Sequence, residues 1–170
     1  MTIRYAAALS AAGLAWPALA ADLTLKVEIP RLSVAEYHRP YVAIWIEKPD
    51  QSFAGNLAVW YDIKMRNGEG TKWLKDMRTW WRKSGRELKM PVDGISGATR
   101  APGEHTVQFP DSTALGKLAP GEYQLVLEAS REVGGRELVK VPFTWPPQAA
   151  ATTQARGEHE LGAVSVTVKP

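Results

Sequence analysis

Residues 123–144 read YQLVLEASREVGGRELVKVPFT, and this stretch decides the fold. Tyr123–Ala129 and Leu138–Thr144 each have the length and the alternating, Val- and Leu-rich pattern of a short β-strand. Between them lie the paired glycines Gly134 and Gly135, which are a strong hairpin turn signal. The stretch therefore predicts two neighbouring antiparallel strands joined by a tight turn.

The same pattern of short strands recurs on both sides of this hairpin. Five further strands are predicted at Leu23–Ile29, Tyr41–Glu47, Leu57–Ile63, His105–Phe109 and Ala163–Val168. Seven short strands separated by turns are typical of an immunoglobulin-like antiparallel β-sandwich. The sequence thus predicts an all-β fold, with residues 21–170 as one domain and residues 146–160 as a loop before the last strand.

One segment, Thr71–Ser84, breaks this period of two. It places tryptophans and a methionine at helical spacing, so we predict one amphipathic helix inserted between strands of the sandwich. In one interpretation Trp73, Met77 and Trp80 dock this helix on the sandwich and its basic residues form a solvated face. In a second interpretation Trp81 stays partly exposed and contacts a ligand. The basic face would also suit an anionic partner or membrane head groups, although the small net charge disfavours this use.

The composition excludes several classes of protein. The chain has 170 residues, of which 45% are hydrophobic and 23% charged, as in ordinary globular proteins. It has no cysteine, so disulfides, thiolate metal sites and cysteine nucleophiles are excluded. A formal charge of +3 is too small to predict nucleic-acid binding. The three histidines lie far apart in the sequence, so we name no metal ligand, and no recognisable hydrolase or nucleotide-binding motif is present.

Residues 1–20, MTIRYAAALSAAGLAWPALA, have the pattern of a secretory signal peptide. A basic Arg4 precedes a short apolar run, and Ala18-Leu19-Ala20 is a small-x-small cleavage signal. No later apolar stretch is long enough to span a membrane. We therefore expect cleavage after Ala20 and a soluble protein in a bacterial periplasm.

The stretch Asp93–Thr99, DGISGAT, is the most informative for function. Asp-Gly and Ser-Gly are ordinary turn dipeptides, so one interpretation is a plain surface turn. The stretch also resembles the flavin-attachment motif of exported bacterial proteins: Asp, a small residue, any residue, Ser or Thr, Gly, Ala, and Ser or Thr. The residues that match its fixed positions are Asp93, Ser96, Gly97, Ala98 and Thr99.

This resemblance implies a covalent flavin. The motif occurs in the covalent-flavin subunits of sodium-pumping quinone reductase and related complexes, where a periplasmic flavin transferase cleaves FAD and esterifies FMN to the last hydroxyl. Thr99 would be that acceptor here. The acceptor hydroxyl must be exposed and its neighbours small and flexible, which Gly94, Gly97 and Ala98 would provide. The flavin-attachment domain of the quinone reductases is not a sandwich of this pattern, so only the motif is shared.

Three residues near the motif are candidates for contact with the flavin. An indole can stack on an isoalloxazine ring, and we expect Trp81 to do so. A guanidinium pairs well with a phosphate, and Arg82 or Arg100 would fill this role.

A longer pattern resembles a family of predicted periplasmic proteins of unknown function. It comprises Trp73–Trp81 (WLKDMRTWW), the Asp93–Thr99 motif, Pro120–Tyr123 (PGEY) and Arg131–Val139 (REVGGRELV), and it covers most of residues 23–146. The resemblance implies an association with flavin transferases and with PepSY-type membrane proteins linked to iron or electron transfer.

Two hypotheses follow. In the first, the protein is a periplasmic electron carrier with FMN on Thr99, a substrate of a flavin transferase rather than an independent enzyme, and a partner of a PepSY-type membrane reductase. In the second, it is a cofactor-free binding or interaction module. The two hypotheses differ at Thr99, because only the first requires this hydroxyl.

Overall fold

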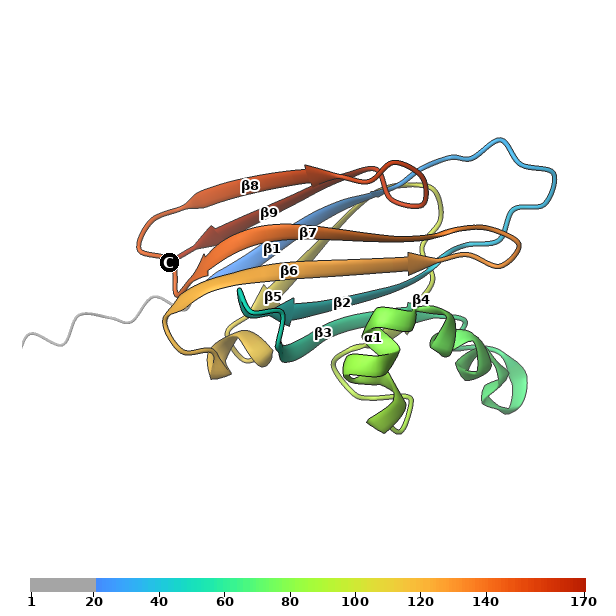
Figure 1. The fold of residues 1–170 in the computed structure, drawn as a ribbon, viewed down its shortest axis with the longest axis horizontal. Coiled ribbons are helices and arrows are strands. Elements are labelled where there is room, and N and C mark those ends of the chain that lie inside the picture. The colour runs from blue at the N-terminus through green and yellow to red at the C-terminus, as the bar shows by residue number, and fades with distance from the viewer. Residues whose placement is uncertain (1–20) are drawn as a thin grey trace, which may run out of the picture.

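The computed structural model describes residues 21–170, which form two β-sheets packed face to face (Figure 1). The predicted signal peptide, residues 1–20, lies outside the described residues. In spatial order, the first sheet has strands β5 (Gly103–Pro110), β1 (Asp22–Ile29), β9 (Ala163–Lys169) and β8 (Ala151–Arg156). The second has strands β4 (Ser96–Ala98), β3 (Phe53–Tyr61), β2 (Tyr41–Glu47), β6 (Gly121–Ser130) and β7 (Arg136–Trp145). The predicted all-β sandwich is confirmed.

The predicted hairpin is the pair β6 and β7, which run antiparallel with Ser130 opposite Arg136. The turn between them closes over the side chain of Arg131. A Cβ atom on Gly134 would lie 2.5 Å from Arg131 Cζ, so a residue larger than glycine would displace that side chain. Gly134 therefore leaves room for the side chain of Arg131 beneath the turn.

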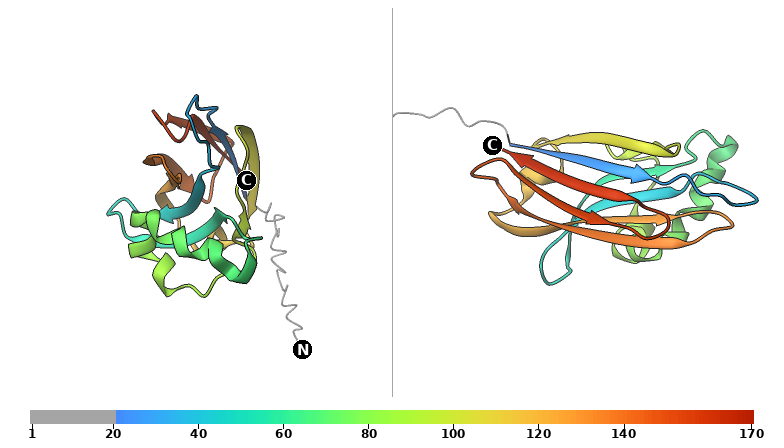
Figure 2. Two further views of the ribbon diagram at one scale, coloured as in Figure 1. Left: turned by 90° about the vertical axis from the view of Figure 1, so that its right-hand side faces the viewer. Right: turned by 90° about the horizontal axis from the view of Figure 1, so that it is seen from above.

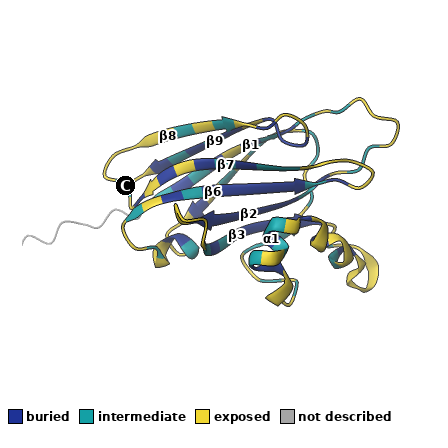
Figure 3. Cartoon of the chain, in the orientation of Figure 1, coloured by how far each residue is buried: buried dark blue, intermediate teal, exposed yellow. Residues whose placement is uncertain are grey.

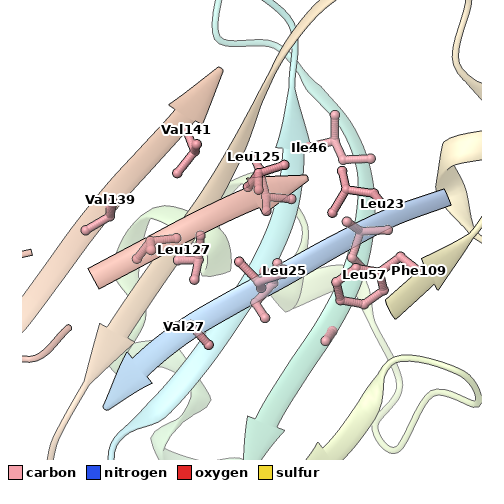
Figure 4. Close-up of a cluster of buried hydrophobic side chains, with 14 of the residues drawn as sticks. Leu23, Leu25, Val27, Ile46, Leu57, Phe109, Leu125, Leu127, Val139 and Val141 are labelled. Atoms are coloured by element: carbon pink, nitrogen blue, oxygen red, sulfur yellow. The ribbon is translucent and has the colours of Figure 1, made fainter. Parts of the chain in front are cut away.

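The main core lies between the two sheets. Alternate residues of β1 are fully buried and meet the inward side chains of β2, β3 and β6. Figure 4 shows part of this cluster, including Leu23, Leu25, Val27, Ile46, Leu57, Phe109, Leu125, Leu127, Val139 and Val141. Burial of such side chains contributes about 25 cal/mol per Å² of apolar surface, and this is the main force that holds the sheets together.

Residues 21–170 form nine strands rather than the predicted seven, and two of them correct the sequence analysis. Ala151–Arg156 is strand β8, paired with β9, although residues 146–160 were predicted to be a loop. Residues on both faces of β8 are exposed or half-buried, so its sequence carries no hydrophobic alternation. Ser96–Ala98 is strand β4, which pairs parallel with β3, so the sandwich is not purely antiparallel.

The single helix predicted over residues 71–84 is wrong. The structure has a 3₁₀ segment η1 (Arg66–Asp76), a short α-helix α1 (Arg78–Lys83) and a 3₁₀ turn η2 (Gly85–Glu87); another 3₁₀ turn, η3 (Ala114–Lys117), precedes β6. The break has a physical cause in Glu128 of β6, which is 0% exposed. Its carboxylate accepts hydrogen bonds from the backbone N–H groups of Thr79 (3.1 Å) and Trp80 (2.7 Å), so a new helix begins there.

The helical segments cover the outer face of the second sheet, away from β8 and β9 (Figure 2). Met77 and Trp80 are buried there against Trp45 and Val59. Trp73 does not dock, contrary to the first interpretation above, and is exposed. The second sheet is thus covered on both faces, while η1 and the β1–β2 loop are largely exposed (Figure 3).

Candidate functional site

The first part of the Asp93–Thr99 motif is a tight turn. Gly94 has φ 79°, a left-handed conformation that glycine adopts without strain. The hydroxyl of Ser96 accepts a hydrogen bond from the backbone N–H of Val92 (2.8 Å), and the backbone N–H of Ser96 donates to the Val92 carbonyl (3.0 Å). Ser96 therefore closes the turn with its side chain, and Asp93 lies exposed on it.

The second part of the motif is strand β4, at the edge of the second sheet. Gly97 lies opposite Trp60 of β3, and a Cβ atom at Gly97 would lie 3.3 Å from Trp60 Cδ1. The backbone N–H of Thr99 continues the pairing by donating to the Tyr61 carbonyl (3.2 Å). The loop predicted to be flexible is thus in part an ordered edge strand. Gly97 is small because its backbone packs on the indole of Trp60.

Thr99 alone among the motif residues lines a cavity of about 770 Å³. This volume lies within the range of about 300–1,000 Å³ that small-molecule sites occupy. The cavity is lined by residues of the β1–β2 loop, η1 and the β6–β7 turn. These three segments lie at the same end of the sandwich (Figure 1). The motif therefore ends with a hydroxyl at the wall of a ligand-sized space.

The sheet order gives the length of this cavity. Thr99 follows β4, whereas Ser130 ends β6, and the ends of β3 and β2 lie between them. Three inter-strand spacings of about 4.8 Å place the two positions about 14 Å apart. The cavity extends from the Thr99 side of the sheet to the β6–β7 turn.

A buried ion pair forms the wall at the far end of the cavity. Arg131 is 8% exposed and binds Glu160 through Nε (2.8 Å) and Nη2 (3.1 Å), and this pairing raises the pKa of the guanidinium. The ring of Tyr37 lies 5.9 Å from the guanidinium carbon. Burial raises the pKa of Tyr37, which the nearby Arg131 only partly offsets, so the phenol is protonated at neutral pH. Within residues 21–170, Arg131 Nη1 and the Tyr37 hydroxyl have no hydrogen-bond partner.

Charged side chains of both signs line the cavity. Arg39 and Arg78 are exposed there and form no ion pair within residues 21–170. Asp62, Asp76 and Glu132 also line it. Two arginines without a carboxylate partner suit a ligand that carries a phosphate group.

Trp73 presents an aromatic surface to the cavity. It is 36% exposed, and η1 holds it in place. The hydroxyl of Tyr41 donates to the Gly70 carbonyl (3.1 Å), which fastens η1 to the sheet. A Cβ atom on Gly70 would lie 2.1 Å from the Asp62 carbonyl oxygen, so only glycine permits this close approach. The position of Trp73 is therefore set by contacts at Tyr41 and Gly70.

The structure places the other predicted flavin contacts outside this cavity. Trp81 is half-buried in the cluster beneath α1, with its ring centroid 6.3 Å from that of Trp80. Arg82 is exposed on α1. Arg100, directly after the acceptor, lies over the ring of Trp60 at 5.0 Å from the centroid. Of the predicted site residues, only Thr99 lines the cavity.

Except for Thr99, sequence analysis did not assign the lining residues to a site, and those missed include Tyr37, Arg39, Trp73, Arg78 and Arg131. A signal existed for some of them. Tyr37 and Arg39 come just before the predicted strand at 41–47, and Arg131 comes just after the predicted strand at 123–129. Antiparallel neighbours bring such ends together, so these residues could have been assigned to one end of the sheet.

One comparison with known proteins gives a match. Residues 22–163 match a family model described as "Predicted periplasmic protein (DUF2271)". Neither a curated protein nor a solved structure matches the chain. Over residues 21–170, none of the helices is long and apolar enough to cross a membrane. The family description agrees with the predicted periplasmic location, and the chain belongs to this family of predicted periplasmic proteins.

Proposed function

We propose that this periplasmic protein carries FMN esterified to Thr99 and acts as an electron carrier. The observation that carries the proposal is that Thr99, at the acceptor position of the motif, is the motif residue that lines the cavity. FMN would supply the redox chemistry, while the protein supplies its position and electrostatic surroundings.

The attachment reaction balances with FAD as the co-reactant. The Thr99 Oγ attacks the phosphorus on the FMN side of FAD, and a new phosphoester bond forms. The pyrophosphate bond breaks, AMP leaves with its electron pair, and the threonine hydroxyl proton is released. A flavin transferase would catalyse this step, as the resemblance of the Asp93–Thr99 motif implies.

Three features of the structure support this proposal. Among residues 21–170, no strand pairs with the outer edge of β4, so a modifying enzyme can approach the motif from that side. Arg39 and Arg78 line the same cavity as Thr99, and because neither forms an ion pair with another described residue, they could balance the negative charge of a phosphodiester. The cavity volume of about 770 Å³ is sufficient for a tricyclic ring and its side chain.

The test is the intact mass of the mature protein after co-expression with a bacterial flavin transferase and a supply of FAD. We expect a gain equal to FMN minus water. Thr99→Ala abolishes the gain, whereas Thr99→Ser retains the acceptor hydroxyl and the flavin. Thr106→Ala, which removes an exposed threonine on β5, is the matched control and keeps the full gain.

An unmodified mass, under conditions that flavinylate a known acceptor protein, refutes the proposal. The cofactor-free binding module then becomes the better hypothesis, with the same cavity as its binding site. If the mass gain is found, we further propose a PepSY-type membrane reductase as the electron partner. Addition of membranes containing that reductase and its electron donor should then bleach the yellow absorbance of the protein.

A further inference from the structure

Resting on the proposed attachment at Thr99, we propose that the isoalloxazine ring lies in the cavity and stacks on Trp73. The site therefore recognises a planar aromatic ring through Trp73 of η1, separately from the covalent bond at Thr99. This placement differs from the Trp81 contact that the sequence predicted.

Among the tryptophans at residues 21–170, Trp73 is the exposed one. Trp45, Trp80 and Trp145 are buried in the cores. Trp60 is buried and already has the Arg100 guanidinium over its ring. A ring-stacking residue needs a free aromatic face, and Trp73 supplies one within the cavity.

The location of Trp73 fits a ligand that is tethered at Thr99. Both residues line the same cavity, and Thr99 pairs through its backbone with Tyr61, the last residue of β3. The chain continues from β3 into η1, so the acceptor and the aromatic platform are attached to the end of the same strand. A ribityl chain is flexible and separates the ring from the phosphate, so the ring of a flavin attached at Thr99 can lie elsewhere in the same cavity.

The surroundings of Trp73 also suit a flavin rather than a purely apolar ring. Arg78 follows Trp73 at the start of α1 and lines the cavity without an ion-pair partner within residues 21–170. The flavin ring system carries carbonyl acceptors on one edge, and its phosphodiester carries a negative charge. An aromatic surface and a guanidinium that line the same cavity therefore complement both the face and the polar edge of the ring.

The test compares Trp73→Leu with Trp81→Leu as the matched control, in protein co-expressed with the transferase. Stacking on an indole quenches flavin fluorescence. We expect weak emission per bound flavin from the wild-type protein and from Trp81→Leu, and emission close to that of free FMN from Trp73→Leu. Trp73 is exposed, so its replacement should leave the melting temperature unchanged, and circular dichroism verifies the fold of both variants.

A second measurement separates the ring site from the attachment. Riboflavin, which has no phosphate, is titrated into protein purified without the transferase. We expect Trp73→Leu to weaken its binding about 5- to 150-fold, the range for loss of one aromatic stacking contact, and Trp81→Leu to leave it unchanged.

The outcomes are distinct. A mass gain with no effect of Trp73→Leu on fluorescence overturns the ring placement and leaves the attachment standing. No mass gain, with riboflavin binding that depends on Trp73, overturns the attachment and supports the ring site. No mass gain and no riboflavin binding overturns both.

Discussion

A single carboxylate, that of Glu137 on β7, holds the turn between β8 and β9. Its Oε1 accepts the backbone N–H of Glu158 (2.5 Å), and its Oε2 accepts those of His159 (3.1 Å), Glu160 (2.8 Å) and Leu161 (2.9 Å). Glu137→Gln replaces one acceptor oxygen by an NH₂ group that faces a backbone N–H. Hydrogen bonds to a charged group contribute about 1.5–3 kcal/mol each, so we expect a loss of about 2 kcal/mol at pH 7.

The pKa of Glu137 gives this loss a pH dependence. Burial alone would raise the pKa, but the four backbone N–H groups outweigh it and hold the pKa below its ordinary value. A group whose pKa is lowered by folding stabilises the native state above its unfolded pKa of about 4.3, and this stability disappears as the pH falls through the folded pKa. The difference between Glu137→Gln and the wild type should therefore be full at pH 7 and small near pH 3.

The assay is thermal unfolding by circular dichroism at both pH values. For a chain of this size, about 2 kcal/mol corresponds to a fall of about 4–8 °C in Tm. Glu158→Gln is the matched control, because it makes the same change on an exposed side chain of the same turn. The reasoning is refuted if Glu137→Gln has the same Tm as the control at pH 7, or if the Tm difference from the wild type is as large at pH 3 as at pH 7.

Four further results are expected. Glu128→Gln removes the carboxylate that accepts the first N–H groups of α1 and binds Arg136 (2.7 Å). It should lower the free energy of unfolding in urea by about 2–3 kcal/mol and alter the near-UV circular dichroism signal of Trp80. Glu47→Gln should lower the free energy of unfolding by a similar amount at pH 7. Burial alone would raise the pKa of Glu47, but bonds from two lysines and an indole hold it below its ordinary value. The loss of stability should therefore become smaller at acid pH. Glu104→Gln, which breaks an exposed pair with a lysine, should change stability by less than about 1 kcal/mol. In flavinylated protein, Arg78→Gln should lower the midpoint potential by about 20–40 mV in redox titration, as expected for about 1–2 kcal/mol in a two-electron couple.

The sequence predicted the strands well because their signal is local. Each of the seven predicted strands is present, and the hairpin at residues 123–144 pairs as its glycines indicate. Alternating side chains report which face of a strand is buried, and this information is contained within a few neighbouring residues. The strand at residues 151–156 was missed because it lies at a sheet edge with both faces largely exposed.

The helical region could not be predicted in the same way, because its form depends on distant residues. The sequence around Thr71–Ser84 is periodic, but Glu128, far along the chain, decides where α1 begins. The same applies to Trp73, whose helical spacing indicated a docked residue. In the structure Trp73 is exposed, on a segment that is held to the sheet at Gly70 by the Tyr41 hydroxyl and by a close approach to the Asp62 carbonyl. Such long-range contacts leave no periodic trace in the sequence.

The location of the cavity follows from how the second sheet is covered. One face of this sheet packs on the first sheet and the other on η1 and α1, so neither face is free for a ligand. A ligand can therefore bind only at the ends of the strands. There the connecting segments supply arginines and aromatic side chains. Strand β4 has only three residues and ends at Ala98, which pairs with Tyr61, the last residue of β3. Thr99 is therefore released from the ladder at the sheet end, where its hydroxyl can bond to a ligand while its backbone still holds to β3.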